Sequence, residues 1–144
     1  MKKSILLVLL ALNALMQAAG GTMMLSAPAK MAREVFHVAS SAGVEQLMGV
    51  IGAAVIGFCL LTLWALASIL RGQPSGYELA LALGASLIVI SVGMYATGSC
   101  SSGELDLAKG LAITLAAWLA RAELKVRDRA GRAPVPTSLH QRAS

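Results

Sequence analysis

Three long stretches of this chain contain no charged residue, namely residues 4–29, 47–70 and 79–98. The hydrocarbon core of a bilayer is about 30 Å thick, and an α-helix that rises about 1.5 Å per residue crosses it with about 20 apolar residues. Each stretch is long enough to do so. The sequence therefore predicts an all-α integral membrane protein.

The composition leaves no room for a separate soluble domain. Of the 144 residues, 57% are hydrophobic and only 13% are charged, whereas a soluble domain carries about 25% charged residues. We expect one membrane domain over residues 1–122 and a basic tail over residues 123–144 that is disordered from about residue 131. Nucleic acid is not an expected partner, because no aromatic platform accompanies the basic charge.

The uncharged stretches predict spans at residues 4–25, 47–70 and 79–97. A fourth span at residues 105–122 requires Lys109 and Arg121 to extend toward the headgroups, because its uncharged part covers only residues 110–120. Asp106 and Lys109 are three residues apart and can pair on one helix face. We expect a four-helix bundle, although a helix that lies in the interface is the alternative for this last segment.

The distribution of Lys and Arg predicts the orientation of the chain. Two lysines precede the first span, Arg71 follows the second, and the chain from Arg121 onward holds six basic residues against two acidic ones. The opposite side has Lys30, Arg33 and Lys109. This bias places both termini in the cytoplasm, and we expect a multi-pass protein of a bacterial inner membrane. Membrane lipids are expected partners, since a basic flank attracts anionic lipid.

The N-terminal segment has a second interpretation as a secretory signal peptide. It combines two lysines with an apolar run over residues 5–16 and small residues at positions 18–20. Cleavage would leave three spans and place the two ends on opposite sides. We favour an uncleaved helix, because the apolar run continues to Leu25 and because Gln17 stands three residues before the cut, where a small residue is required.

The connection between the first two spans predicts a short helix. Ser26 can cap it, and Pro28 fits its first turn. Met31, Val35 and Val38 then fall on one face. We expect a short amphipathic connector helix on the outer membrane surface.

Small residues recur at four-residue intervals in the predicted spans, most clearly as Gly49, Ala53 and Gly57 in the second span. Lipid tails are as apolar as Leu, so helices in a bilayer associate through close packing at small residues rather than through burial from water. We interpret this stripe as a helix-packing seam inside the bundle.

Three polar residues are candidates for ligand binding. Asn13 and Gln17 lie one turn apart in the first span, and Glu45 lies at the outer start of the second. Polar groups in hydrocarbon are costly unless they are paired, so the first two residues should face the bundle. Either they form an interhelical hydrogen bond, or they line a pocket with Glu45 for a small apolar ligand such as a quinone or a lipid.

Cys100 lies in a predicted outer loop and is a candidate for thiol redox chemistry or for a disulfide between protomers. Cys59 falls inside the second span, where it should pack as a small apolar residue. His37 and His140 are predicted on opposite sides of the membrane, and no closely spaced pair of Cys or His is typical of a metal site. We therefore expect no metal, and no bound cofactor beyond the quinone or lipid considered above.

Two short patterns flank the first connection. Residues 21–28 place a glycine and then a proline at the end of the first span, and residues 44–52 place a glutamate and then a glycine at the start of the second. Both patterns, and the four-span layout over residues 4–122, resemble the DoxX-like group of small bacterial membrane proteins. The resemblance implies a four-helix membrane fold, a subunit role in quinone-linked oxidoreductases for some members, and a polar contact by Glu45 at the outer mouth of the bundle.

No catalytic signature appears in the sequence, so we expect a protein without an enzymatic activity of its own. The predicted loops are short, and no Asp or Glu lies in the interior of a predicted span. These features favour an accessory or structural subunit that packs in a larger membrane complex or with copies of itself. The alternative is a binder or carrier of a small apolar ligand.

Overall fold

The computed structural model describes residues 2–34, 37–96 and 103–131, and every regular element in these ranges is an α-helix. The helices are α1 (Lys2–Ser26), α2 (Pro28–Glu34), α3 (Ala42–Leu70), α4 (Pro74–Ala96) and α5 (Gly103–Gly131). Helices α1, α3 and α4 are long and apolar enough to cross a membrane. The prediction of an all-α protein with membrane-spanning helices is therefore confirmed at this level.

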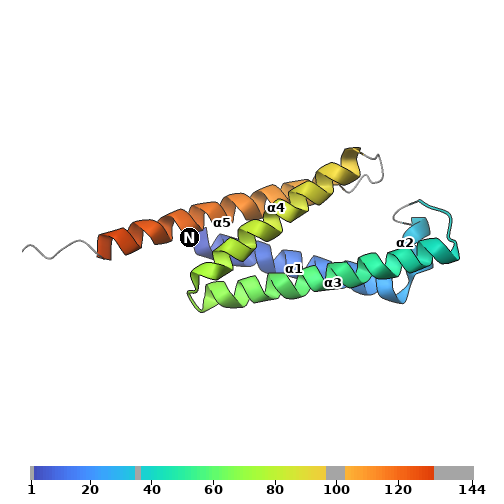
Figure 1. Ribbon diagram of the computed structural model, residues 1–144, viewed down its shortest axis with the longest axis horizontal. Coiled ribbons are helices and arrows are strands. Elements are labelled where there is room, and N and C mark those ends of the chain that lie inside the picture. The colour runs from blue at the N-terminus through green and yellow to red at the C-terminus, as the bar shows by residue number, and fades with distance from the viewer. Residues whose placement is uncertain (1, 35–36, 97–102, 132–144) are drawn as a thin grey trace, which may run out of the picture.

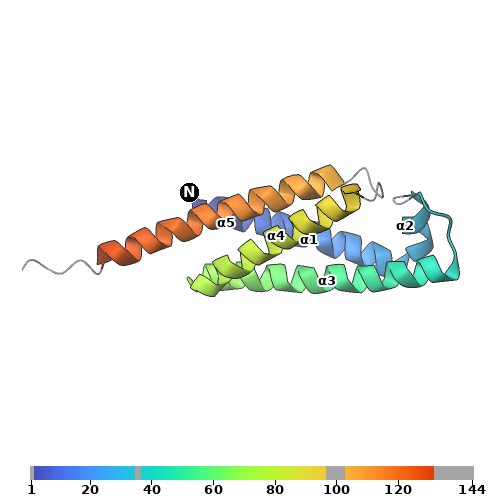
Figure 2. The same ribbon diagram turned by 45° about the horizontal axis from the view of Figure 1, so that its top comes forward.

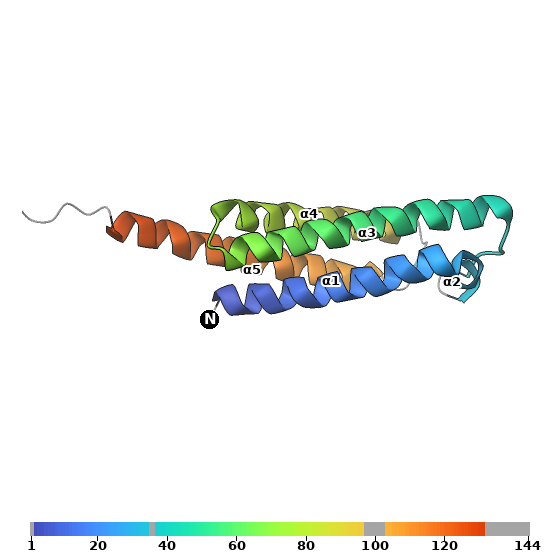
Figure 3. The same cartoon turned by 90° about the horizontal axis from the view of Figure 1, so that it is seen from below.

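The four long helices associate as two antiparallel pairs, α1 with α3 and α4 with α5. Contacts of α3 with α4 and of α1 with α5 join the two pairs. The pairs lie close together at the end that holds the N-terminus and the α3–α4 turn, and they diverge toward the opposite end (Figures 1 and 2). The view from below shows the α1–α3 pair in front of the other two helices (Figure 3).

A buried apolar cluster lies where the two pairs meet. Its members come from all four long helices: Leu6, Leu10, Ala65, Ile69, Tyr77, Ala80, Leu83, Ile113, Ala117 and Ala120. Most of the surface of the candidate spans is left outside this cluster. In a bilayer that surface faces lipid, so the bundle depends on close packing between helices rather than on the removal of apolar groups from water.

Two pairs of facing glycines bring the helix backbones together. A Cβ atom added to Gly52 would lie 2.8 Å from Met24 Cβ and 3.1 Å from the carbonyl oxygen of Gly21. A Cβ atom added to Gly110 would likewise lie 3.1 Å from the carbonyl oxygen of Gly84. Real Cβ atoms essentially never come within 3.0 Å of such a neighbour, and a Cβ atom at Gly110 would also lie 2.9 Å from Ile88 Cγ1, so both helix contacts favour a residue without a side chain.

The predicted seam of Gly49, Ala53 and Gly57 is not one of these contacts. Ala53 and Gly57 are exposed, and a Cβ atom at Gly49 or Gly57 would meet nothing within 4 Å. The prediction of a seam inside the bundle is therefore wrong at these positions. The stripe is offset around the helix from Gly52, and α1 packs on the Gly52 side.

Helices α3 and α4 each begin five residues before the predicted spans. Ser41 caps α3, since its side chain accepts a hydrogen bond from the backbone N–H of Val44, and Glu45 lies in the first turn. Pro74 opens α4 after Gly72, whose φ of 76° favours glycine. The predicted spans omit these first turns. An uncharged run marks only the part of a helix that lies in hydrocarbon, and a polar first turn lies outside that part.

The connector helix α2 confirms the predicted element but not its details. Pro28 is its first residue, as predicted. Ser26 ends α1 instead of capping α2, because its hydroxyl donates to the carbonyl of Thr22 at 2.8 Å. Ala32 is the buried residue of α2, whereas Val38 is exposed.

Helix α5 contains the predicted fourth span and continues to Gly131, past the end of the bundle in all three views. The predicted pair of Asp106 and Lys109 forms, with 2.5 Å between Nζ and Oδ1. The first part of the predicted tail is therefore helical, and residues 132–144 of that tail lie outside the described residues.

We predict opposite outcomes for two alanine substitutions on α3. Gly52→Ala should destabilise the protein in detergent by about 1–3 kcal/mol, since the new methyl group meets Met24 and the backbone of Gly21. Gly49→Ala should be neutral or stabilising by up to about 1 kcal/mol, because the methyl group enters open space and alanine favours a helix. Thermal unfolding of both variants checks this, and equal melting temperatures would contradict it.

Candidate functional site

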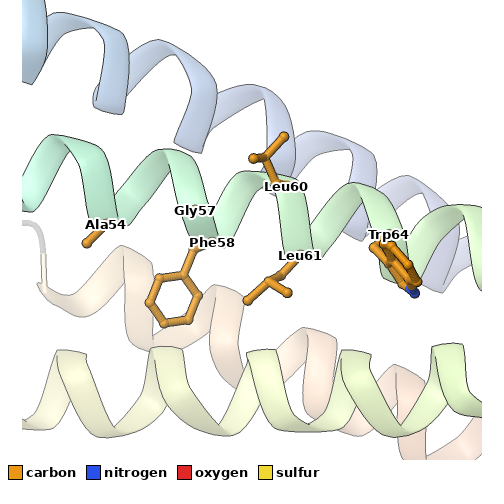
Figure 4. Close-up of a pocket in the computed structure, with 6 residues that line it drawn as sticks. All are labelled: Ala54, Gly57, Phe58, Leu60, Leu61 and Trp64. Carbon is orange, nitrogen blue, oxygen red and sulfur yellow. The ribbon is translucent and has the colours of Figure 1, made fainter.

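A shallow hollow lies on the outward side of α3, with a volume of about 550 Å³. Its lining residues all belong to α3: Ala54, Gly57, Phe58, Leu60, Leu61 and Trp64. Phe58 and Leu61 point toward α4, Leu60 points to the opposite side, and Gly57 lies between them (Figure 4). The missing side chain of Gly57 leaves a depression that its larger neighbours border.

The hollow shares Gly57 with the stripe of small residues. We call the surface formed by Gly49, Ala53, Gly57, Leu61 and Trp64 the α3 outer face. The Trp64 side chain is prominent on it, since 70% of that residue is exposed. This surface is apolar and has small residues beside large ones, so it can receive the side chains of another transmembrane helix but offers no group for acid–base or nucleophilic chemistry.

A separate set of polar contacts joins α1 to α3 in the interior. The Thr62 hydroxyl donates to the carbonyl of Phe58 at 2.8 Å and lies 3.1 Å from Gln17 Oε1. The Cys59 thiol donates to the carbonyl of Ala14 at 3.3 Å. Gln17 therefore takes part in an interhelical contact, which is the simpler of the two predicted interpretations.

Asn13 lies on the same inward side of α1 and has a different environment. Only 4% of this residue is exposed, and its Nδ2 atom has no hydrogen-bond partner. A buried donor without a partner costs about 1–3 kcal/mol in stability. Asn13 is therefore an available hydrogen-bond donor in the interior of the bundle.

Glu45 does not share a pocket with Asn13 and Gln17. It is half-buried in the first turn of α3, where it accepts a hydrogen bond from the Ser40 hydroxyl at 2.5 Å. Thr62, the partner of Gln17, lies 17 residues after Glu45, which is about 25 Å along the helix. The predicted common site is therefore wrong, because α1 and α3 run antiparallel and place these groups at different depths.

The remaining sequence candidates give no further site. Cys59 is buried, as predicted, and Cys100 lies outside the described residues. Within residues 2–34, 37–96 and 103–131, no three side chains of His, Cys, Asp or Glu gather as metal ligands.

Sequence reasoning missed two features of this arrangement. Arg121 of α5 donates to Glu78 of α4 at 2.7 Å, although the two residues are 43 positions apart. The sequence does contain a signal for this ion pair. Glu78 immediately precedes the third predicted span and Arg121 lies at the end of the fourth, so the opposite charges lie at the same side of the membrane. The large residues around Gly57 were also missed, because Leu and Phe are ordinary in any membrane helix.

No protein-family model, curated protein or solved structure matches this chain. The resemblance to the DoxX-like group therefore stays a prediction that depends on the two short sequence patterns.

We predict that Asn13→Leu stabilises the purified protein. The substitution replaces an unpaired buried amide by an apolar side chain of similar size, which removes a penalty of about 1–3 kcal/mol. Gln17→Leu is the matched control, and it should destabilise by about 0.6 kcal/mol because it removes the contact with Thr62. Thermal unfolding in detergent measures both effects. A lower melting temperature for Asn13→Leu would show that the amide has a partner.

Proposed function

We propose that this protein is an accessory subunit of a larger membrane complex and that it binds a transmembrane helix of a partner protein through the α3 outer face. The observation that carries the proposal is the position of Gly49, Ala53 and Gly57. These small residues face away from the bundle, while other glycines hold the bundle together.

A second transmembrane helix gains packing energy when it lies against such a face. Small residues allow a second backbone to approach closely, and van der Waals packing then replaces looser contacts with lipid chains. The hollow over Gly57 adds a place for a larger side chain of the partner. A transmembrane helix fits this combination of a narrow apolar stripe and a depression, whereas a soluble partner cannot reach it.

We further propose that α5 is the fourth span. It packs along α4, and its outward residues Leu111, Leu115 and Trp118 are exposed apolar side chains suited to lipid. Asp106, Lys109 and Arg121 lie near the ends of this segment, where they reach the headgroups. Four crossings place both termini on one side, which we assign to the cytoplasm of a bacterial inner membrane.

A cross-linking experiment tests the partner site. A photoreactive group in place of Leu61 should cross-link a partner polypeptide in native membranes, whereas the same group in place of Leu115 on α5 should not. Ala53→Leu should lower the Leu61 cross-link at least about fivefold, since the added side chain prevents close approach of the partner helix at a cost of about 1–3 kcal/mol.

The control for this experiment is Ala11→Leu, which enlarges an exposed alanine on α1. It should leave the cross-link and the melting temperature unchanged, and Ala53→Leu should leave the melting temperature unchanged as well. Cross-linking that is insensitive to Ala53→Leu would exclude the α3 outer face. Cross-linking to the same chain alone would replace the heteromeric complex by a homo-oligomer.

The unpaired amide of Asn13 favours a second candidate function, the binding of a small apolar ligand with a carbonyl oxygen, such as a quinone or a lipid. Such an oxygen would accept the hydrogen bond that Nδ2 does not make within the chain. Protein purified in mild detergent should retain the ligand, Asn13→Leu should lose it, and Ala53→Leu should keep it. Mass spectrometry of extracted small molecules checks this, and equal retention by all three proteins would exclude Asn13 as the donor.

A further inference from the structure

The two ends of the bundle differ in charge. One end carries Lys2, Lys3, Arg71 and Arg121, and we call it the cationic end. The described carboxylates there are Glu78 and Glu123. Beyond Glu123, the sequence of α5 adds three basic residues against one acidic residue.

The described charges of the opposite end balance one another. Its described charged side chains are three basic residues and three acidic residues: Lys30, Arg33, Lys109, Glu34, Glu45 and Asp106. Two of the three cations are in ion pairs, Lys30 with Glu34 at 3.9 Å and Lys109 with Asp106 at 2.5 Å. The described side chains of this end therefore carry no excess of positive charge.

The cations of the cationic end are gathered by the fold. Leu6 and Ile69 belong to the same buried cluster, so the first turn of α1 and the end of α3 lie side by side. Lys2 and Lys3 precede Leu6 by one turn, and Arg71 is the C-cap residue of α3. All three are exposed, and none forms an ion pair with a carboxylate of the described chain.

We infer that the cationic end binds the headgroups of anionic phospholipids in the leaflet that surrounds it. Exposed cations next to membrane-spanning helices lie at headgroup depth, and a phosphate is the anion present there in quantity. Each Lys or Arg near the surface strengthens binding to anionic lipid about fivefold. The N-terminus of α1 adds a positive helix dipole to the charge of Lys2 and Lys3.

This inference is independent of the partner proposed for the α3 outer face. It also assigns a side to each end of the bundle, because the cytoplasmic leaflet is the one rich in anionic lipid and in basic flanking residues. The cationic end, with the N-terminus and the end of α5, then faces the cytoplasm.

Two exposed tryptophans provide a direct measurement. Trp64 and Trp118 adjoin members of the buried cluster near the cationic end, and 70% and 60% of these residues are exposed. The full-length protein is reconstituted in vesicles of phosphatidylcholine, to which brominated phosphatidylglycerol or brominated phosphatidylcholine is added. Bromine quenches tryptophan fluorescence, so the two titrations give the relative affinity for the anionic lipid.

We expect brominated phosphatidylglycerol to quench at lower mole fractions than brominated phosphatidylcholine. The double variant Lys3→Gln with Arg71→Gln should weaken this preference about 25-fold, which is about fivefold for each cation. The matched double variant Lys30→Gln with Arg33→Gln removes the same charge from the opposite end and should keep the preference. Raising the salt from about 0.1 M to about 1 M should also reduce it, since the Debye length falls from about 10 Å to about 3 Å.

Equal quenching of the wild-type protein by the two brominated lipids would overturn the inference. An equal loss of preference in both double variants would also overturn it, because the effect would then follow net charge and not the cationic end. Circular dichroism of each variant in the same vesicles shows that the helices are intact. The Leu61 cross-link of the double variants reports separately on the partner site.

Discussion

The close approach of backbones at paired glycines is the interaction on which this structure depends. Gly21 faces Gly52 between α1 and α3, and Gly84 faces Gly110 between α4 and α5. In a bilayer, burial from water cannot draw helices together, so contacts of this kind carry a large share of the packing energy. Each glycine pair fixes one antiparallel helix pair, and the buried apolar cluster then joins the two pairs at one end.

Residues that hold the helices together inside the bundle are not available to bind other molecules. The internal packing therefore determines which residues could have a function at the surface. Once Gly52 serves the internal contact, the stripe of Ala53 and Gly57 on the same helix faces outward with open space beside it. The polar groups divide in a similar way. Gln17 is used in the contact with Thr62, whereas Asn13 keeps an amide without a partner. The proposed partner site and the proposed ligand site therefore involve different residues, and separate substitutions can test them.

The sequence predicted the helices better than it predicted the contacts. Uncharged runs located α1, α3 and α4, and the spacing of Asp106 and Lys109 correctly predicted their ion pair. Small residues do lie at the helix contacts, but on α3 the contact is made by Gly52 and not by the predicted Gly49 and Gly57. Helix α3 has glycines on more than one face, and periodicity cannot tell which face meets a neighbour. The predicted pocket of Asn13 with Glu45 does not form, because Asn13 lies in the middle of α1 and Glu45 lies in the first turn of α3.

The sequence by itself determined that the chain is helical and that three of its helices can cross a membrane, because length and absence of charge are properties of each segment alone. It also determined that Lys and Arg residues outnumber Asp and Glu residues in the segments that flank the predicted spans. Only the tertiary structure decided which small residues lie inside and that Arg121 pairs with Glu78. These features depend on the rotation and pairing of helices, which arise from contacts between segments far apart in the chain.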